Sequence, residues 1–185
     1  MTSVITLPFG RPLTRSDLEG LGEQPDDGHR YELIDGVLIV SPGPQFRHQV
    51  VVGNLHLLLR QACPTGLQVL LAPFAVVLAD DTEVQPDLIV APLSQFTRKE
   101  LPGAPLLAIE VLSSSTRRVD LLLKRDRLQA AGVPSYWLVD PDTPSVTVLE
   151  LEDGIYVERA HIVGDEDHAV GAPFAVRLVP SELLS

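Results

Sequence analysis

Two acidic residues that border or interrupt apolar runs are the part of this sequence best suited to chemistry. Asp87 directly precedes the run Leu88–Val90, and Glu110 lies inside the run Leu107–Leu112. An ionised carboxylate in such surroundings is costly to desolvate unless a partner balances its charge. If the two runs form neighbouring strands, both carboxylates can bind one divalent cation. Oxygen ligands favour Mg2+ or Mn2+, which can activate water and stabilise charge on a phosphodiester. The alternative for each acid is a solvent-exposed strand end, and the residues alone leave both interpretations open.

A lysine further along the chain adds to the chemical interpretation. Lys124 is one of two lysines in the sequence, and on a helix it would share a row with Leu121 and Leu128. Its ammonium group can therefore emerge beside the strand end, where it would position water or neutralise a phosphate. The alternative is an i,i+4 ion pair with Asp120 on an exposed face, worth a few tenths of a kcal/mol.

The elements that must position these residues are predicted from apolar spacing and turn residues. Asp35-Gly36 separates the apolar runs 30–34 and 37–40 and predicts a tight hairpin. Apolar residues at helical spacing predict a helix from Pro44 to about Ala62. Strands are expected at 67–72, 74–79, 87–91 and 106–112, followed by a helix from Ser115 or Thr116 to about Ala131.

The two ends of the chain complete the prediction. A strand at 135–139 follows the second helix, and this strand–helix–strand order favours a parallel pair within a mixed sheet. A β-meander is expected after it, at 146–151, 156–163 and 174–178. The N-terminal part adds a short helix at 14–18, with Thr14 and Asp17 as a capping pair, and a polar loop from Gly22 to Gly28. We therefore expect an α/β (α+β) fold in a single domain, residues 1–185.

Composition excludes several classes of protein. With 45% hydrophobic residues the chain is not disordered, and its one cysteine excludes an internal disulfide framework and a thiolate zinc cluster. The first twelve residues lack a signal-peptide pattern, and the longest apolar run is too short to span a membrane. We therefore expect a cytoplasmic protein without a membrane partner.

The net charge of −11 argues against a generic nucleic-acid binder, because phosphate affinity comes largely from Lys and Arg. The charge is unevenly distributed, however. Residues 116–138 contain five basic and two acidic residues, whereas residues 139–185 contain ten acidic and two basic ones. The basic segment directly follows the candidate site, which weakens the objection.

An ordered series of short motifs resembles the PD-(D/E)XK nuclease superfamily, and more narrowly its Uma-type restriction endonuclease family. The motifs are Tyr31–Gly36, Pro42 with His48, Gln85–Asp87, Ile109–Ser113 with Ser115 and Thr116, Asp120 with Lys124, and Gly132–Pro141. The resemblance implies a restriction-endonuclease-like core, in which a mixed central β-sheet is flanked by helices. The hairpin would be an N-terminal addition and the meander a C-terminal one. It also implies metal-dependent cleavage of DNA.

The resemblance further implies roles for individual residues. Asp87 and Glu110, with Val111 beside them, match the positions that bind Mg2+ or Mn2+. The superfamily usually has a lysine two residues after the second acid, where this chain has Leu112. Lys124 is the residue that would replace it.

Three more residues are candidates for the same site. Glu32 matches an acid that completes the metal shell or orients water. His48 is a possible substrate contact or a support for the metal site, and a hydrogen-bonded structural role is its alternative. Gln85 is a possible contact for a phosphate or a metal-bound water.

The leading hypothesis is a Mg2+-dependent DNA endonuclease in which Asp87 and Glu110 hold the metal and Lys124 assists the attacking water. The alternative is a catalytically inactive nuclease fold that serves as a binding, regulatory or oligomerisation module. The acidity of the chain and the missing usual lysine favour that alternative. An enzyme of the same fold that acts on RNA or a small phosphodiester is a third hypothesis. A homodimer would supply two sites for two DNA strands.

Overall fold

The computed structural model describes residue 8, residues 10–20 and residues 28–185. Apart from Gly28, the predicted loop Gly22–Gly28 lies outside the described residues. In chain order the elements are α1 (Arg15–Glu19), β1 (Arg30–Ile34), β2 (Val37–Ser41), α2 (Phe46–Ala62), β3 (Leu67–Leu71), β4 (Ala75–Ala79), β5 (Thr82–Val84), β6 (Leu88–Pro92), η1 (Leu93–Gln95), β7 (Glu100–Pro102), β8 (Leu107–Val111), η2 (Val119–Lys124), α3 (Arg125–Ala130), β9 (Ser135–Asp140), β10 (Ser145–Glu152), β11 (Ile155–Val163), β12 (His168–Val170), β13 (Val176–Leu178) and η3 (Pro180–Leu184).

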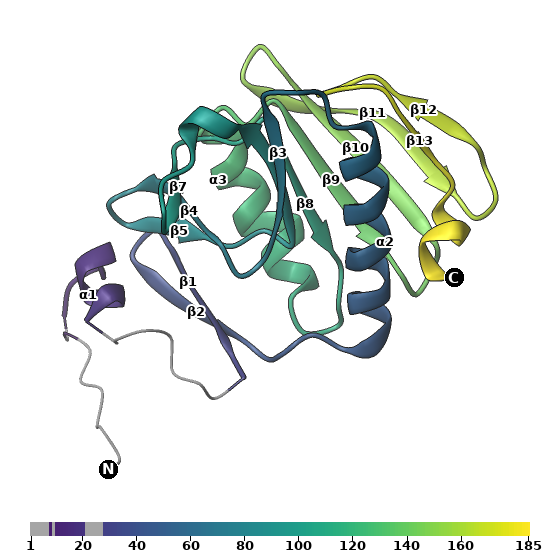
Figure 1. The fold of residues 1–185 in the computed structure, drawn as a ribbon. Coiled ribbons are helices and arrows are strands. Elements are labelled where there is room, and N and C mark those ends of the chain that lie inside the picture. The colour runs from purple at the N-terminus through teal and green to yellow at the C-terminus, as the bar shows by residue number, and fades with distance from the viewer. Residues whose placement is uncertain (1–7, 9, 21–27) are drawn as a thin grey trace.

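A six-stranded mixed sheet, in the order β11-β10-β9-β8-β6-β3, forms the centre of the fold (Figure 1). β8 and β9 are parallel, as the strand–helix–strand order predicted. The other neighbouring strands of this sheet are antiparallel. β10 and β11 are the first two strands of the predicted C-terminal meander, but its third strand, β13, pairs with β12 and not with β11. The α+β fold class is confirmed.

The inner strands β6, β8 and β9 of this sheet are buried on both faces, which explains the nearly continuous apolar runs of β6 and β8. Alternate residues of β8, among them Leu107 and Ile109, belong to the same core cluster as Val51 and Leu55 of α2. Ala108, between them, belongs to a second core cluster on the opposite face, with Leu128 of α3. The alternation sends neighbouring side chains of one strand into two different cores.

The predicted hairpin is β1–β2, and its turn residues Asp35 and Gly36 both have positive φ angles, as such a turn requires. It is part of a five-stranded sheet in the order β2-β1-β5-β4-β7. The hairpin is therefore built into a second sheet. Two strands of that sheet, β5 and β7, were not predicted, because three residues are too few to show a periodic pattern.

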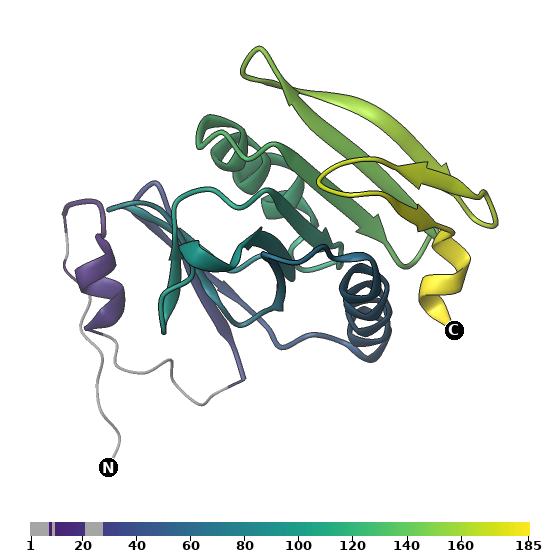
Figure 2. The same cartoon turned by 45° about the horizontal axis from the view of Figure 1, so that its top comes forward.

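The C-terminal region and the second helix also differ from the prediction. β12 and β13 form a separate two-stranded sheet, and together with η3 they lie beside α2 (Figure 2). The predicted helix 115–131 is present, but its first part, η2, is a π-helix that continues into α3. The predicted capping of α1 is confirmed, since Asp17 accepts a hydrogen bond from the Thr14 N–H at 2.8 Å.

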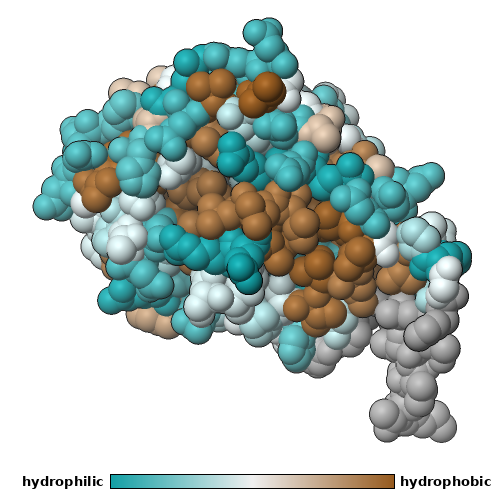
Figure 3. Space-filling view, turned by 180° about the vertical axis from the view of Figure 1, so that it is seen from behind, coloured by the Kyte–Doolittle hydropathy of each residue, from teal (hydrophilic) through white to brown (hydrophobic). Residues whose placement is uncertain are grey.

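The surface opposite to the view of Figure 1 carries a broad central area of apolar side chains (Figure 3). Large exposed apolar residues in the described part of the chain include Val37, Leu122 and Leu123. No helix among the described residues has the length and the apolar character that a membrane crossing requires.

Candidate active site

The two candidate acids are brought together by the register of two neighbouring strands. β6 and β8 are antiparallel, with Leu88 paired to Ile109, so the next step along the ladder places Asp87 opposite Glu110. Both residues are buried, with 3% of Asp87 and 0% of Glu110 exposed. The solvent-exposed alternative for the two acids is therefore wrong.

Asp87 is held by groups from three different elements. Its Oδ1 accepts a hydrogen bond from Arg30 Nη1 of β1 at 2.9 Å. Its Oδ2 lies 3.0 Å from His48 Nε2 of α2 and accepts the Val111 N–H of β8 at 2.8 Å. Burial alone would raise the pKa of this carboxyl, but the His48 hydrogen bond, the Arg30 charge and the Val111 N–H outweigh it and hold the pKa below its usual value. Asp87 is therefore ionised at neutral pH.

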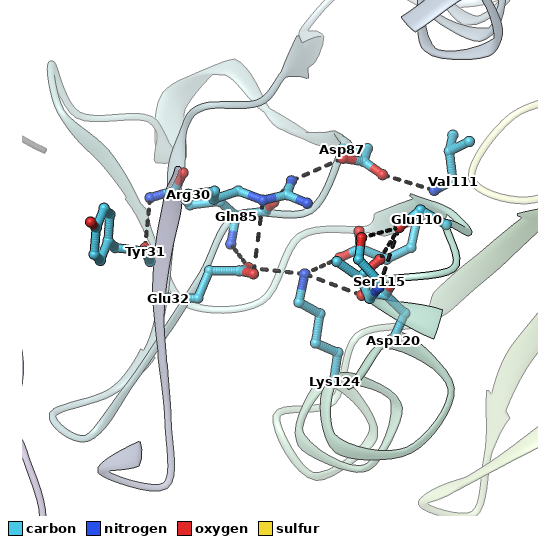
Figure 4. A network of polar contacts seen from close by, with 12 residues as sticks. Arg30, Tyr31, Glu32, Gln85, Asp87, Glu110, Val111, Ser115, Asp120 and Lys124 are labelled. Atoms are coloured by element: carbon cyan, nitrogen blue, oxygen red, sulfur yellow. Dashed lines mark hydrogen bonds and ion pairs between the residues drawn. The ribbon is translucent and has the colours of Figure 1, made fainter. Parts of the chain in front are cut away.

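Lys124 lies among the three other acids of the site (Figure 4). Its Nζ is 2.9 Å from Glu110 Oε1, 2.9 Å from Glu32 Oε1 and 3.4 Å from Asp120 Oδ1. The residue is only 1% exposed. Burial would lower the pKa of the ammonium group, but the three carboxyl groups raise it above its usual value. Lys124 therefore stays protonated.

The π-helix η2 presents Asp120 and Lys124 to the interior, while Leu122 and Leu123 of the same segment are exposed. π-Helical turns are rare in proteins, and those that do occur are often found at functional sites. The Tyr136 hydroxyl donates to the Asp120 carbonyl at 3.0 Å and ties this segment to β9. The predicted Asp120–Lys124 pair exists, but its placement on an exposed face was wrong. The ammonium group faces inward, where it meets Glu32 and Glu110.

Glu32 and Gln85 connect the lysine to the arginine of the site. Glu32 Oε1 accepts the Gln85 N–H at 2.7 Å, and Glu32 Oε2 lies 3.9 Å from Arg30 Nε. The Gln85 carbonyl accepts from Arg30 Nη1 at 3.0 Å, and its side chain donates to the Tyr31 carbonyl at 3.3 Å. Gln85 thus acts on the site through its main chain.

We call Arg30, Glu32, Asp87, Glu110, Asp120 and Lys124 the charged cluster. It holds four carboxyl groups but only two cations. Burial raises the pKa of Glu110 well above its usual value, and although Lys124 opposes this, the charges of Asp120 and Asp87 add to it. Glu110 Oε2 is buried and has no hydrogen-bond partner in the described part of the chain. The carboxyl groups of the charged cluster therefore outnumber its cations, and an added cation would improve the charge balance.

A divalent cation fits this chemistry, because it would balance the two carboxylates that Arg30 and Lys124 leave uncompensated. Among the described residues, no group of three or more His, Cys, Asp and Glu side chains is arranged to hold a metal ion. A Mg2+ ion held by Asp87 and Glu110 would have two oxygen ligands from these side chains and would take the others from water or phosphate, as Mg2+ sites commonly do.

A pocket of about 390 Å3 connects one side of the cluster to solvent. Its walls are Gly28–Arg30, Pro42–Gln45, His48, Gln49, Val52, Ala72, Pro73, Asp87 and Ser113–Thr116. Of the predicted site residues, Asp87 and His48 line it, whereas Glu32, Gln85, Glu110, Val111 and Lys124 do not. Asp87 is therefore the acid through which an incoming molecule meets the cluster.

Comparison with known proteins decides the relationship that the motifs indicated. A family model described as "Uma2: Putative restriction endonuclease" matches residues 18–177. The chain belongs to the Uma2 family. The resemblance to Uma-type sequences is therefore confirmed.

A solved structure has a similar fold. It is the crystal structure of a "putative nuclease belonging to DUF820" from Anabaena variabilis ATCC 29413, with a TM-score of 0.71 and 24% sequence identity. The similarity covers 94% of this chain and 98% of that one. No curated protein matches the chain.

The basic segment of this Uma2 protein offers fewer free cations than its composition indicated. Lys124 is buried among three acids, Arg117 pairs with Asp140 at 2.7 Å, and Arg127 pairs with Asp35. Three of the five basic residues in 116–138 are thus engaged within the chain.

Sequence reasoning did not name Arg30 as a site residue, and it considered Asp120 only as the ion-pair partner of Lys124. Arg30 had a recognisable signal, because residues 30 and 32 of one strand point to the same face. An arginine two residues before the candidate acid Glu32 is therefore placed to reach the same site. Asp120 had a signal too, because its i,i+4 spacing from Lys124 places both side chains on one face of a helical segment.

Proposed function

We propose that this Uma2 protein is a metal-dependent DNA endonuclease that uses Mg2+ or Mn2+ to hydrolyse phosphodiester bonds. The observation that carries the proposal is the position of Asp87 opposite Glu110, with an ionised acid on the wall of a pocket and an unpartnered carboxyl oxygen behind it. The family description and the "putative nuclease" of similar fold support the same class of activity.

In this proposal Asp87 and Glu110, with the main chain of Val111, hold the metal. The bound ion would supply an activated water and charge stabilisation for the phosphate. Arg30 lies beside Asp87 on the pocket wall and would contact the phosphate that enters. His48 fixes the orientation of Asp87 through its hydrogen bond.

Three further residues act on the site without lining the pocket: Lys124, Glu32 and Gln85. Lys124 keeps Glu110 in place and assists catalysis through that acid, because the ammonium group does not line the pocket. Glu32 shares the lysine, and Gln85 holds Glu32 and Arg30 through its main chain. The three form the support of the metal-binding pair.

The test is cleavage of plasmid and oligonucleotide DNA by the purified protein with Mg2+, Mn2+ or EDTA. We expect metal-dependent cleavage that Asp87→Asn and Glu110→Gln reduce to the level seen in EDTA. Asp142→Asn and Glu158→Gln, which change exposed acids outside the site, serve as matched controls. Wild-type rates in both site variants, with their folds intact, would refute the proposal.

One observation favours the alternative, a catalytically inactive binding or oligomerisation module. The lysine of the site is fully buried in ion pairs, and Leu112 occupies the position where the superfamily usually has its lysine. Calorimetric titration with Mg2+ and Mn2+ separates the two functions. Metal binding that is lost in Asp87→Asn supports the enzyme, and no binding at millimolar metal supports the module.

Three further expectations belong to this proposal. Residues 1–185 act as one domain, two chains form a homodimer, and the protein works in the cytoplasm. Two active sites in a dimer would address the two strands of DNA. Sedimentation velocity at increasing protein concentration tests the dimer, and a monomer throughout would contradict it.

A further inference from the structure

We propose that the pocket beside Asp87 takes one unpaired nucleotide of a DNA strand, so that the preferred substrate is single-stranded or locally unpaired DNA. This inference rests on the proposed nuclease function and names its substrate class.

The recessed position of Asp87 limits how a phosphodiester can reach it. The residue is 3% exposed and faces the pocket, whose volume is about 390 Å3. This volume is within the range of sites that enclose one small molecule, and a nucleotide is a molecule of that size. A nucleotide in a duplex is stacked and paired and must leave the stack before it can enter. An unpaired strand does not bear that free-energy cost.

The walls of the pocket match the parts of a nucleotide. Val52, Ala72 and three prolines give an apolar surface for a base and a sugar. Gln45 and Gln49 are exposed on the same wall, and their amide groups can both donate to and accept from the edge of a base. Arg30, the cation among the described lining residues, stands next to Asp87 and can meet the phosphate.

The charges near the site do not favour an intact duplex. Duplex binding depends on many contacts between phosphates and Lys or Arg. Here Lys124, Arg117 and Arg127 are engaged with acids of the chain. The chain as a whole carries −11. A pocket that recognises one nucleotide needs few such contacts.

Fluorescence anisotropy with the complete protein in EDTA tests the inference without cleavage. The probes are a labelled DNA strand and the same sequence as a duplex. We expect the single strand to bind at least about 10-fold more tightly, as base contacts outside a duplex allow. Gln49→Trp should fill the pocket and weaken this binding by at least about 10-fold. Gln61→Trp, an exposed position on the same helix away from the pocket, should bind like wild type.

Each contrary result has a distinct meaning. Equal or tighter binding of the duplex, or wild-type binding by Gln49→Trp, would overturn the inference. Tighter binding of an RNA strand of the same sequence would overturn the assignment to DNA. If Asp87-dependent cleavage is equally fast on duplex DNA and unaffected by Gln49→Trp, the inference fails while the nuclease function stands. If neither form of DNA is bound or cut, both fail.

Discussion

Lys124 and Glu110 form a buried ion pair between η2 and β8, with 2.9 Å between Nζ and Oε1. The lysine comes from the helical layer, and the acid comes from the central sheet. The pair therefore joins the two layers at the point where the site is assembled. Its charges support the fold and hold in place the acid that we propose as a metal ligand.

Replacing Lys124 should test the structural half of this role. Lys124→Met leaves Glu32, Glu110 and Asp120 without their shared cation, and breaking a buried pair in this way costs about 3–5 kcal/mol. We expect a loss of this size in urea unfolding. Lys99→Met, the same change at an exposed lysine, is the control. A loss in Lys124→Met no larger than in the control would contradict the prediction.

Metal binding should stabilise the folded protein. The charged cluster has more carboxyl groups than cations, so a divalent ion that binds only the folded state raises its stability. At a metal concentration of 100 times the Kd, the gain is about 2.7 kcal/mol. A thermal melt with Mg2+ or Mn2+ should show a higher Tm for wild type and no shift for Asp87→Asn. An equal shift in both proteins would place the metal elsewhere.

His48 should matter for metal affinity because it orients Asp87 through Nε2. Removing a residue that supports a metal ligand typically lowers affinity about 10- to 100-fold. We expect a loss of this size for His48→Ala in a calorimetric titration. His56→Ala, on the same helix but away from the pocket, should bind metal like wild type. If His48→Ala bound the metal ion as tightly as wild type, the role of His48 would be confined to packing in the fold.

Asp140 should contribute stability that depends on pH. Burial alone would raise the pKa of this carboxyl, but Arg117 and the N–H groups of Thr143 and Asp142 hold it below its usual value. A depressed pKa contributes stability above the pKa of the unfolded chain, and this contribution is lost as pH falls through the folded pKa. Asp140→Asn should therefore cost about 1 kcal/mol at pH 7 and progressively less below about pH 4. Urea unfolding across that range checks this, and a cost that does not change with pH would contradict it.

The central part of the fold could be predicted from local sequence. Asp35-Gly36 specifies its turn, and the apolar runs of β6 and β8 specify buried strands because few other structures accommodate them. The juxtaposition of Asp87 and Glu110 followed from one assumption, that the two strands are neighbours. The pairing register of the two strands then places these acids opposite each other.

The remaining parts depend on contacts between distant segments. The strands β5 and β7 exist because other strands hold them, and their own residues carry no pattern. Arg30 of β1 belongs to the site because it contacts Asp87, a residue 57 positions away in the sequence. Lys124 of the π-helix meets Glu32 of β1 and Glu110 of β8, which are distant from it in sequence. The residues of each segment alone do not reveal these contacts with distant segments.

The alternation of β8 between two cores constrains how the gene can change. Substitutions along the strand can be absorbed one at a time, but inserting a single codon would exchange the two faces. Glu110 would then point into the core beside α2, and an apolar residue would replace it next to Lys124. Related genes should therefore vary in length within their loops and keep a constant spacing from Leu107 to Val111.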